Sequence, residues 1–382
     1  MDVEALVGRA ETAIRGGDLQ QAIRMLEEAA RLRPDDASLW LRIGAMHRGT
    51  NDLGAALDAV HKALAIEPRD FTALLMRASL LQRMGDAQAG EAWGHALAHK
   101  PAGDLPRQVS DAVTEGERHH EAWIEARETR MRRATAEPER RASDEELSRI
   151  ERFRTNALRR TRPFHSDPTD FHYPGLVERE FHPRRLFPWL DEVEAATDSI
   201  AEELARVMAA ERAELVPYVQ YDEHLPLDQW RELNRNLDWT AIHLLQNGEL
   251  VEANARYCPR TLATLEKIPQ PRIAGVGPNA MFSLLAPHTR IPPHVGVANT
   301  RLVCHLPLIV PDGCWFRVGA ETRLWKRGEA LVFDDTIEHE AMNPSDELRV
   351  VFIFDIWHPD LSDVEREAVS ALLSSERANA PL

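Results

Sequence analysis

The chain has 382 residues and a mass of 43.2 kDa, which is enough for about two or three domains with buried cores. Its content of 43% hydrophobic and 28% charged residues excludes a wholly disordered chain. No run of about 18 apolar residues occurs and the first residues lack an apolar stretch, so neither a membrane-spanning helix nor a secretory leader is expected. Nearly all of the net charge of −16 follows residue 160, which argues against a nucleic-acid partner for that half.

Cysteine usage indicates a reducing environment. The three cysteines are too few for a disulfide framework, and no Cys-x-x-Cys pair is present. A zinc ribbon and a thioredoxin-like motif are therefore excluded. A cytoplasmic location is expected on the same grounds.

Three internal repeats occupy residues 1–104. Each repeat pairs a helix with a Gly/Asn-Asp turn, a second amphipathic helix and a proline that ends it. The turns begin 34 residues apart, at Gly17, Asn51 and Gly85. Two helices per 34 residues resemble the tetratricopeptide repeat, with an ordinary helical bundle as the alternative. The sequence therefore predicts an N-terminal α-helical repeat array.

Residues 105–160 are expected to form a helical linker or cap. Helical patterns cover about 105–132 and 143–160, and the stretch between them is charged and contains a proline. Ser143 and Glu146 have the spacing of a capping box. Glutamates interleave with the arginines of this region, so a solvated helix face is favoured over a basic binding patch.

A second domain is predicted over residues 161–382. Helical periodicity covers 186–210, and short β-type runs separated by Gly, Pro, Asn and Asp follow from about 270. This pattern is typical of an all-β sandwich or barrel, and a jelly-roll pair of sheets is the natural choice. The runs lie at 280–286, 300–310, 314–319, 321–328, 329–335 and 348–357.

Candidate chemistry centres on histidines and arginines of these runs. His294 and His339 could bind ferrous iron, but the carboxylate of the usual two-His, one-carboxylate set is replaced by Gly296. Ligand counting alone leaves a metal site open against ordinary structural histidines. Strand alternation places His305 and Arg301 on one face. Arg349 begins an apolar strand, which suits either a carboxylate clamp or a rim salt bridge.

Three segments carry a family resemblance. FSLLAPHTRIPPHVGVANTRLVCHLPLIVPDGC (282–314), GEALVFDDTIEHE (328–340) and LRVVFIFDIWHPDL (348–361) resemble the aspartyl/asparaginyl β-hydroxylase family of 2-oxoglutarate- and iron(II)-dependent oxygenases. The resemblance runs from about 171 to 361. It implies a double-stranded β-helix, or jelly-roll, oxygenase domain with Fe(II), and with 2-oxoglutarate and O₂ as co-substrates. Repeats ahead of this domain also fit, since family members can carry them.

The resemblance implies roles for individual residues. His294 and His339 match the two iron ligands and are thereby the catalytic residues. Gly296 matches too, because the family lacks the usual carboxylate ligand. Ser283 and Arg349 match the residues that hold the far carboxylate of 2-oxoglutarate.

The co-substrate site also contains a departure from the family. His305 matches the histidine near the end of 2-oxoglutarate that chelates iron. A second family arginine falls on Val303, and Arg301, two residues earlier on the same face, is the candidate replacement. His288 and Arg290 depart from the family at the mouth of the expected pocket.

Two neighbouring features have open interpretations. Asp334 and Asp335 either orient His339 from outside the metal site or form an ordinary turn. Cys304, on the opposite strand face from His305, is expected to pack in the core.

The implied function is hydroxylation of an unactivated C–H bond. The resemblance points to the β-carbon of Asp or Asn in a protein or peptide. The repeats, as a concave array, would present this polypeptide. Hydroxylation of a small molecule or lipid acyl chain, halogenation at the vacant ligand position, and a non-catalytic repeat adaptor remain alternatives.

Overall fold

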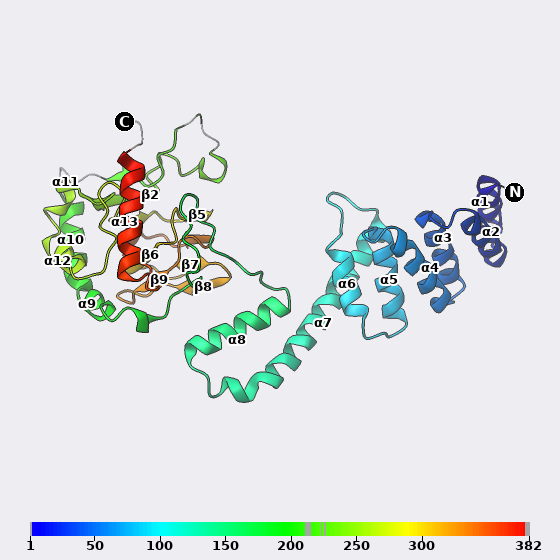
Figure 1. Ribbon diagram of the computed structural model, residues 1–382. Helices are drawn as coiled ribbons and strands as arrows, with labels where there is room; N and C mark the ends of the chain where they lie inside the picture. Colours follow the sequence, from blue (N-terminus) through cyan, green and yellow to red (C-terminus); the bar gives the residue numbers. More distant parts are fainter. Residues whose placement is uncertain (1, 211–214, 223, 225–226, 379–382) are drawn as a thin grey trace. The chain divides into compact units, whose positions relative to one another are not determined.

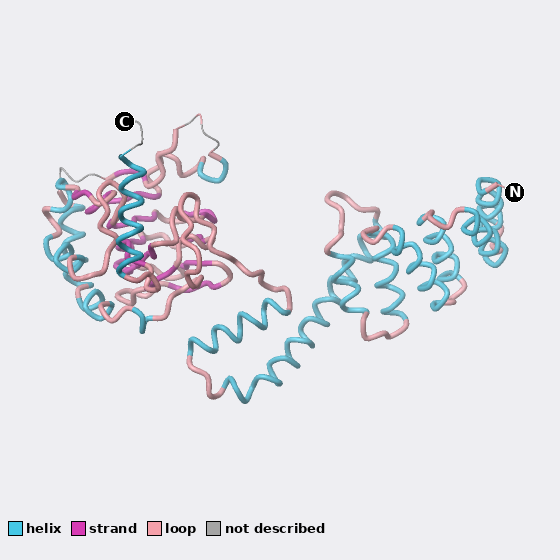
Figure 2. Tube along the Cα trace, viewed as in Figure 1, coloured by secondary structure: helices cyan, strands magenta, loops and turns pink. Residues whose placement is uncertain are grey.

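Residues 1–158 form one compact unit, and their regular elements are all helices in the computed structural model (Figure 1, Figure 2). The structure describes residues 2–210, 215–222, 224 and 227–378. Within these ranges, none of the helices combines the length and apolar character that a bilayer crossing needs. The helices of this unit are α1 (Val3–Arg15), α2 (Leu19–Leu32), α3 (Ala37–Gly49), α4 (Leu53–Ile66), α5 (Phe71–Arg83), α6 (Ala89–Leu97), α7 (Arg107–Glu139) and α8 (Asp144–Ala157).

The turns and caps explain why the repeats fold as helix pairs. Gly17 and Asn51 have φ angles of 80° and 61°, the left-handed conformation that lets one helix end and the next begin. The following residues, Asp18 and Asp52, cap α2 and α4 by accepting a hydrogen bond from a backbone N–H three residues on. Consecutive helices then pack in pairs, which confirms the predicted helical array.

Close approach of α6 and α7 ends the array. A Cβ atom at Gly90 would lie 2.1 Å from Trp123, and one at Gly94 would lie 2.3 Å from His120. On α7, a Cβ at Gly116 would lie 2.3 Å from the ring of Trp93. Only glycine at these three positions lets the two backbones approach this closely. The first part of α7 is therefore the packing partner of the last repeat.

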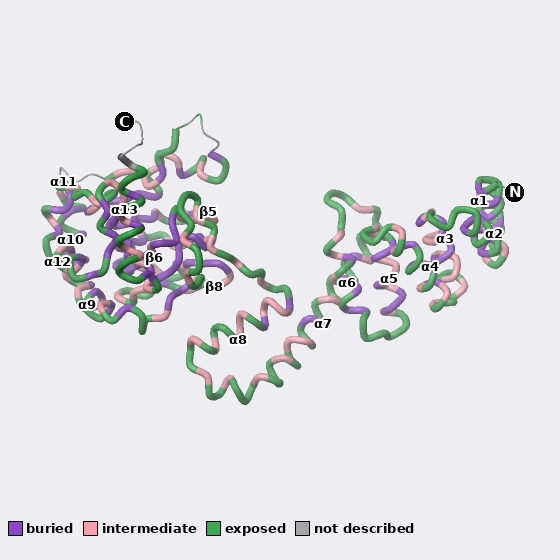
Figure 3. The backbone as a smooth tube through the Cα atoms, viewed as in Figure 1, coloured by how far each residue is buried: buried purple, intermediate pink, exposed green. Residues whose placement is uncertain are grey.

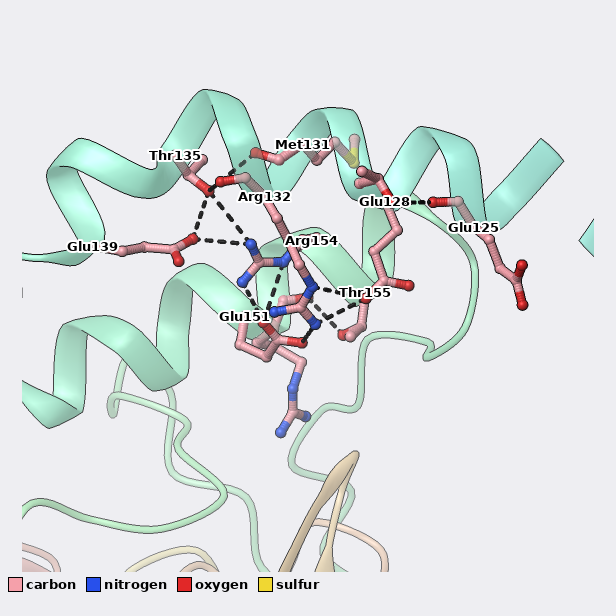
Figure 4. A network of polar contacts seen from close by, with 11 residues as sticks. Glu125, Glu128, Met131, Arg132, Thr135, Glu139, Glu151, Arg154 and Thr155 are labelled. Atoms are coloured by element: carbon pink, nitrogen blue, oxygen red, sulfur yellow. Dashed lines mark hydrogen bonds and ion pairs between the residues drawn. The ribbon is translucent and has the colours of Figure 1, made fainter. Parts of the chain in front are cut away.

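An ion-pair network joins α8 to the end of α7 (Figure 4). Arg154 on α8 is only 6% exposed and donates hydrogen bonds to Glu139 at 2.9 Å and to Thr135 at 3.3 Å. Arg132 donates to Glu128 at 2.8 Å and also reaches Glu151 of α8 at 3.1 Å. The expected capping box at the start of α8 is confirmed. The helix expected to end at 132 continues to 139.

Residues 159–382 form the second unit, with helices against two antiparallel sheets (Figure 1). The larger sheet has the order β1 (Val216–Pro217), β2 (Trp239–Gln246), β4 (Ala280–Leu285), β11 (Arg349–Trp357), β6 (Arg301–Ile309) and β9 (Leu331–Phe333), with β3 (Glu249–Leu250) paired to β2. The smaller sheet has the order β5 (Thr289–His294), β10 (His339–Asn343), β7 (Trp315–Val318) and β8 (Glu321–Leu324). The helical elements are η1 (Arg184–Leu186), α9 (Leu190–Ala195), α10 (Thr197–Met208), η2 (Asp228–Trp230), α11 (Glu252–Ala255), α12 (Pro259–Leu265) and α13 (Asp363–Ala378).

Strand alternation divides the core into two layers, which appear as the buried centre of this unit in Figure 3. Leu302, Cys304 and Leu306 of β6 pack in the cluster that also contains the buried residues of α9 and α10. Val303, from the opposite face, belongs to the cluster between the two sheets, together with residues of β5, β7 and β10. The predicted faces of β6 and the core position of Cys304 are thus confirmed.

Two strands of the structure, β5 and β10, were not predicted from the sequence pattern. β5 contains Pro292 and Pro293, and proline in a strand argues against a central position. In the structure β5 is the edge strand of the smaller sheet, where a missing N–H is tolerated. β10 is mostly polar and so lacks an apolar alternation. The predicted pair of sheets is present, and both sheets are antiparallel. Within the described residues the two sheets stay separate instead of closing into one, so the jelly-roll arrangement stays a prediction.

Candidate active site

A cavity of about 350 Å³ lies in the second unit, lined by both sheets. It brings together all six side chains singled out from the sequence as ligands or co-substrate contacts. These are Ser283, His294, Arg301, His305, His339 and Arg349. They come from β4, β5, β6, β10 and β11, so residues far apart in the sequence meet in one chamber.

His294 and His339 lie side by side in this chamber. They are register partners on β5 and β10, and their ring centroids are 4.0 Å apart. The Nδ1 atom of His294 donates to the carbonyl of Pro292 at 2.8 Å, and that of His339 to the carbonyl of Ile337 at 3.0 Å. Each ring therefore keeps its Nε2 lone pair for a ligand.

Burial keeps both imidazoles neutral. It lowers the pKa of His294 to about 3, with the neighbouring His339 adding to the effect. Burial also lowers the pKa of His339 to about 4. Neutral imidazole is the form that binds a metal ion. The donor pair is thus ready for a cation at neutral pH.

Asp335 fills the space beside Gly296. A Cβ atom at Gly296 would lie 2.1 Å from Oδ2 of Asp335, and the Gly296 N–H donates to the Asp335 carbonyl at 2.7 Å. A carboxylate from a different segment thus lies where a side chain two residues after His294 would begin. In the described part of the chain, no three His, Cys, Asp or Glu side chains are arranged to share one metal ion.

Arg349 lies at another part of the chamber with no acidic partner among the described residues. It is 2% exposed, and its Nη1 donates only to the backbone and hydroxyl oxygens of Ser283, at 3.3 and 3.4 Å. Its guanidinium lies 4.7 Å from the ring centre of Trp325. Burial lowers the pKa of Arg349 to about 10. A buried cation in this state has the chemistry to bind an anion.

Several buried polar atoms of the chamber lack a hydrogen-bond partner. Among the described side chains, these include Nε of Arg349, Nδ1 of His305, Nε1 of Trp325 and Oδ1 of Asp335. Buried polar groups are normally paired, so a cluster of unpaired ones indicates a polar ligand. Trp325 lines the cavity, a position that could not be read from the strand pattern.

Arg301 is the opposite case, because two carboxylates bind it. Its Nη2 lies 3.1 Å from Oδ2 of Asp335, and its Nη1 lies 3.1 Å from Oδ1 of Asp355. Asp355 also accepts the backbone and side-chain N–H groups of Asn279, at 2.8 and 3.0 Å. Burial acts to lower the pKa of Arg301, but the two carboxylates outweigh it and raise the pKa. The replacement role expected for Arg301 stays a prediction.

An aromatic wall lines the chamber beside His294. Tyr218 stacks on Trp239 with ring centroids 3.8 Å apart, and Trp230 lies 5.1 Å from the His294 ring. Trp239 also donates its indole N–H to the Ser283 hydroxyl at 3.1 Å. Burial raises the pKa of Tyr218 to about 12, so the phenol is neutral. Sequence reasoning missed this wall, because these residues lie outside the alternating runs.

The residues expected at the pocket mouth lie at the surface. His288 pairs with the exposed Asp346 at 2.9 Å, and Arg290 binds Glu340 at 3.0 Å through Nε. Arg317 binds Glu340 from the other side. The charge of Glu340 is therefore compensated at the rim.

Sequence comparison assigns the domain that contains this chamber. The family described as aspartyl/asparaginyl beta-hydroxylase matches residues 194–359. This part of the chain is similar to that family. The human aspartyl/asparaginyl beta-hydroxylase is 32% identical over 186 residues, covering 48% of this chain and 24% of the relative. Human aspartate beta-hydroxylase domain-containing protein 2 is 38% identical over 143 residues, covering 37% of this chain and 39% of the relative.

Solved structures similar to part of this chain include helical repeat proteins. The Yersinia enterocolitica secretion chaperone SycD, in complex with a YopD peptide, is 16% identical with a TM-score of 0.29, covering 32% of this chain and 93% of that one. The tetratricopeptide domain of Arabidopsis OM64 is 19% identical with a TM-score of 0.27, covering 31% of this chain and 95% of that one.

Proposed function

We propose that the second unit is an iron(II)- and 2-oxoglutarate-dependent oxygenase of the jelly-roll type. The observation that carries the proposal is the joint occurrence, in one chamber, of two neutral imidazoles whose Nδ1 atoms bind backbone carbonyls and a buried arginine with no acidic partner among the described residues. Two imidazoles and open positions suit ferrous iron. Arg349 suits the distal carboxylate of a keto dicarboxylic acid.

The chain's own residues would bind and orient these groups. His294 and His339 would hold the metal, and Ser283, Arg349 and the indole N–H of Trp325 would hold the far carboxylate. His305, with its unpaired Nδ1, lies in the same chamber for the chelating end. When bound, iron and 2-oxoglutarate supply the oxidation of an unactivated C–H bond, and the protein supplies placement and a dry pocket.

The substrate belongs to the same proposal. The family points to the β-carbon of Asp or Asn in a protein or peptide, and a helical repeat array is a surface type that presents polypeptides. The chain spans only 24% and 39% of the two human relatives, so the activity of those whole proteins comes to this chain as a proposal.

Metal binding tests the proposal directly. His294→Ala and His339→Ala should each weaken binding of divalent iron or manganese by more than about 100-fold, because loss of a ligand costs more than the 10–100-fold loss seen for outer contacts. The matched control is His288→Ala, which removes an exposed histidine. Calorimetric titration of the metal, followed by succinate release from 2-oxoglutarate, gives the readout. If His294→Ala or His339→Ala binds the metal as tightly as the parent protein, the ligand assignment is wrong.

A further inference from the structure

The chamber contains two buried arginines, and only one of them is open to an anion. Arg349 contacts Ser283 and has an unpaired Nε, whereas both Nη atoms of Arg301 are bound by Asp335 and Asp355. Asp355 is fixed in turn by Asn279, which donates two hydrogen bonds to Oδ2. Arg301 is therefore held in place as the cation between two anions.

The charged lining residues are matched by oppositely charged groups. Arg301 and Arg349 equal Asp335 and Asp355 in charge, and Arg290 and Arg317, which are not lining residues, bind the carboxylate of Glu340. Arg317 is shared with Glu338. Divalent iron and doubly charged 2-oxoglutarate, which the proposed function adds, balance each other as well. A further carboxylate beside His294 would find no unpaired cation among these residues. A buried charge without a partner is strongly disfavoured.

The walls near the histidines are aromatic and apolar. Trp230 and Trp239 lie beside His294, Tyr218 stacks on Trp239, and the chamber lining also includes Met281 and Ile353. These surfaces suit an uncharged group, and the unpaired Oδ1 of Asp335 can accept a hydrogen bond from an amide N–H. The same Oδ1 would repel a carboxylate.

From this arrangement we infer that the site selects an uncharged substrate group, such as an asparagine amide, and rejects an aspartate carboxylate. The specificity-determining residues are Asp335 and Asp355, because together they occupy Arg301. This inference rests on the proposed function and narrows its substrate class. It concerns this chain's own charge pairing, independently of what its relatives accept.

The test uses two probes that differ only in the side-chain group, a neutral amide in N-acetyl-asparagine amide and a carboxylate in N-acetyl-aspartate amide. Each is titrated by calorimetry at neutral pH into the full chain loaded with manganese and 2-oxoglutarate. We expect the asparagine probe to bind at least about tenfold more tightly, the factor that 1.4 kcal/mol of discrimination gives. Equal or tighter binding of the aspartate probe, or no binding of the asparagine probe, overturns the inference.

A variant gives the second arm. Asp355→Asn removes one partner of Arg301 and should shift the affinity ratio toward the aspartate probe by roughly tenfold. Asp346→Asn, at an exposed carboxylate, is the control and should leave the ratio unchanged. An unchanged ratio in Asp355→Asn counts against the role of the pairing. Manganese and 2-oxoglutarate are titrated into the protein before the probes. If neither binds, the proposed function and the inference are both excluded.

Discussion

Arg301 and Arg349 line the same chamber, and their surroundings are opposite. Arg301 is bound by two carboxylates at 3.1 Å, while Arg349 has only the oxygens of Ser283 and the face of Trp325. A buried cation with carboxylate partners stabilises the fold. A buried cation without them lowers the stability of the ligand-free protein and can bind an anionic ligand. The comparison teaches that a buried arginine indicates an anion-binding site only when no carboxylate of the protein already binds it.

Stability should separate the two arginines most sharply. Arg301→Met leaves Asp335 and Asp355 without their cation and should lower the free energy of unfolding by about 3–5 kcal/mol. Arg349→Met removes an unpaired charge and should leave the free energy of unfolding of the ligand-free protein unchanged or raise it. Urea denaturation of both variants gives the values. A larger loss in Arg349→Met than in Arg301→Met would reverse the comparison.

Substitution of Arg349, which should have little effect on stability, should have a large effect on the affinity for 2-oxoglutarate. Arg349→Ala should weaken 2-oxoglutarate binding by about 2–5 kcal/mol, because the buried carboxylate loses its charged partner. Arg349→Lys should recover only part of this, since an ammonium cannot form the paired hydrogen bonds of a guanidinium. Arg290→Ala, at an exposed position on the rim, is the control. The clamp is excluded if Arg349→Ala keeps parent-like affinity in a calorimetric titration.

The space beside Gly296 gives a smaller effect. Gly296→Ala places a Cβ atom within 2.1 Å of the Asp335 carboxylate, so Asp335 or its loop must move. We expect a loss of about 1–3 kcal/mol in the free energy of unfolding, the usual cost of overpacking. Gly8→Ala is the matched control, because a Cβ at Gly8 would meet no atom within 4 Å. Equal stability of the two variants in urea would show that the Asp335 carboxylate does not fill this space.

A separate effect concerns a histidine outside the chamber. Burial lowers the pKa of His182 to about 3, with His358 adding to the effect, while an unfolded histidine titrates near 6.5. Protons therefore bind the unfolded chain more readily, and stability should fall as the pH drops from about 6.5 toward 3.

The expected slope for His182 is at most about 1.4 kcal/mol per pH unit in this window. His182→Phe should flatten the pH dependence of unfolding between pH 6.5 and 5 by about one proton, since the ring already packs against Phe187. An identical slope in the variant and the parent would show that His182 is protonated in the folded protein.

The parts of the fold that could be predicted are those with a regular sequence pattern. The helix pairs were found because turns, prolines and period agree, and the faces of β6 were found because leucines alternate with Arg301 and His305. β5 and β10, which carry His294 and His339, were not predicted as strands, because one contains prolines and the other is polar.

The site was predictable residue by residue but not contact by contact. The six expected side chains do meet in one chamber, yet the occupation of Arg301 by Asp335 and Asp355 depends on three segments that are distant in sequence. Sequence alternation gives the face of a residue and carries no information on which charge lies opposite. The aromatic wall was missed for a different reason, since Tyr218 and Trp230 lie outside the alternating runs.

The hydrogen bonds from His294 and His339 to carbonyls two residues earlier in the chain have a mechanical consequence. The carbonyl that orients His294 lies in β5, and the one that orients His339 lies just before β10, so the pair depends on the alignment of β5 with β10. β5 is an edge strand, and Pro292 and Pro293 offer no N–H to a further strand. A ligand that bridges the two rings therefore also fastens the edge strand, and opening of that edge would release the ligand without unfolding the rest of the unit.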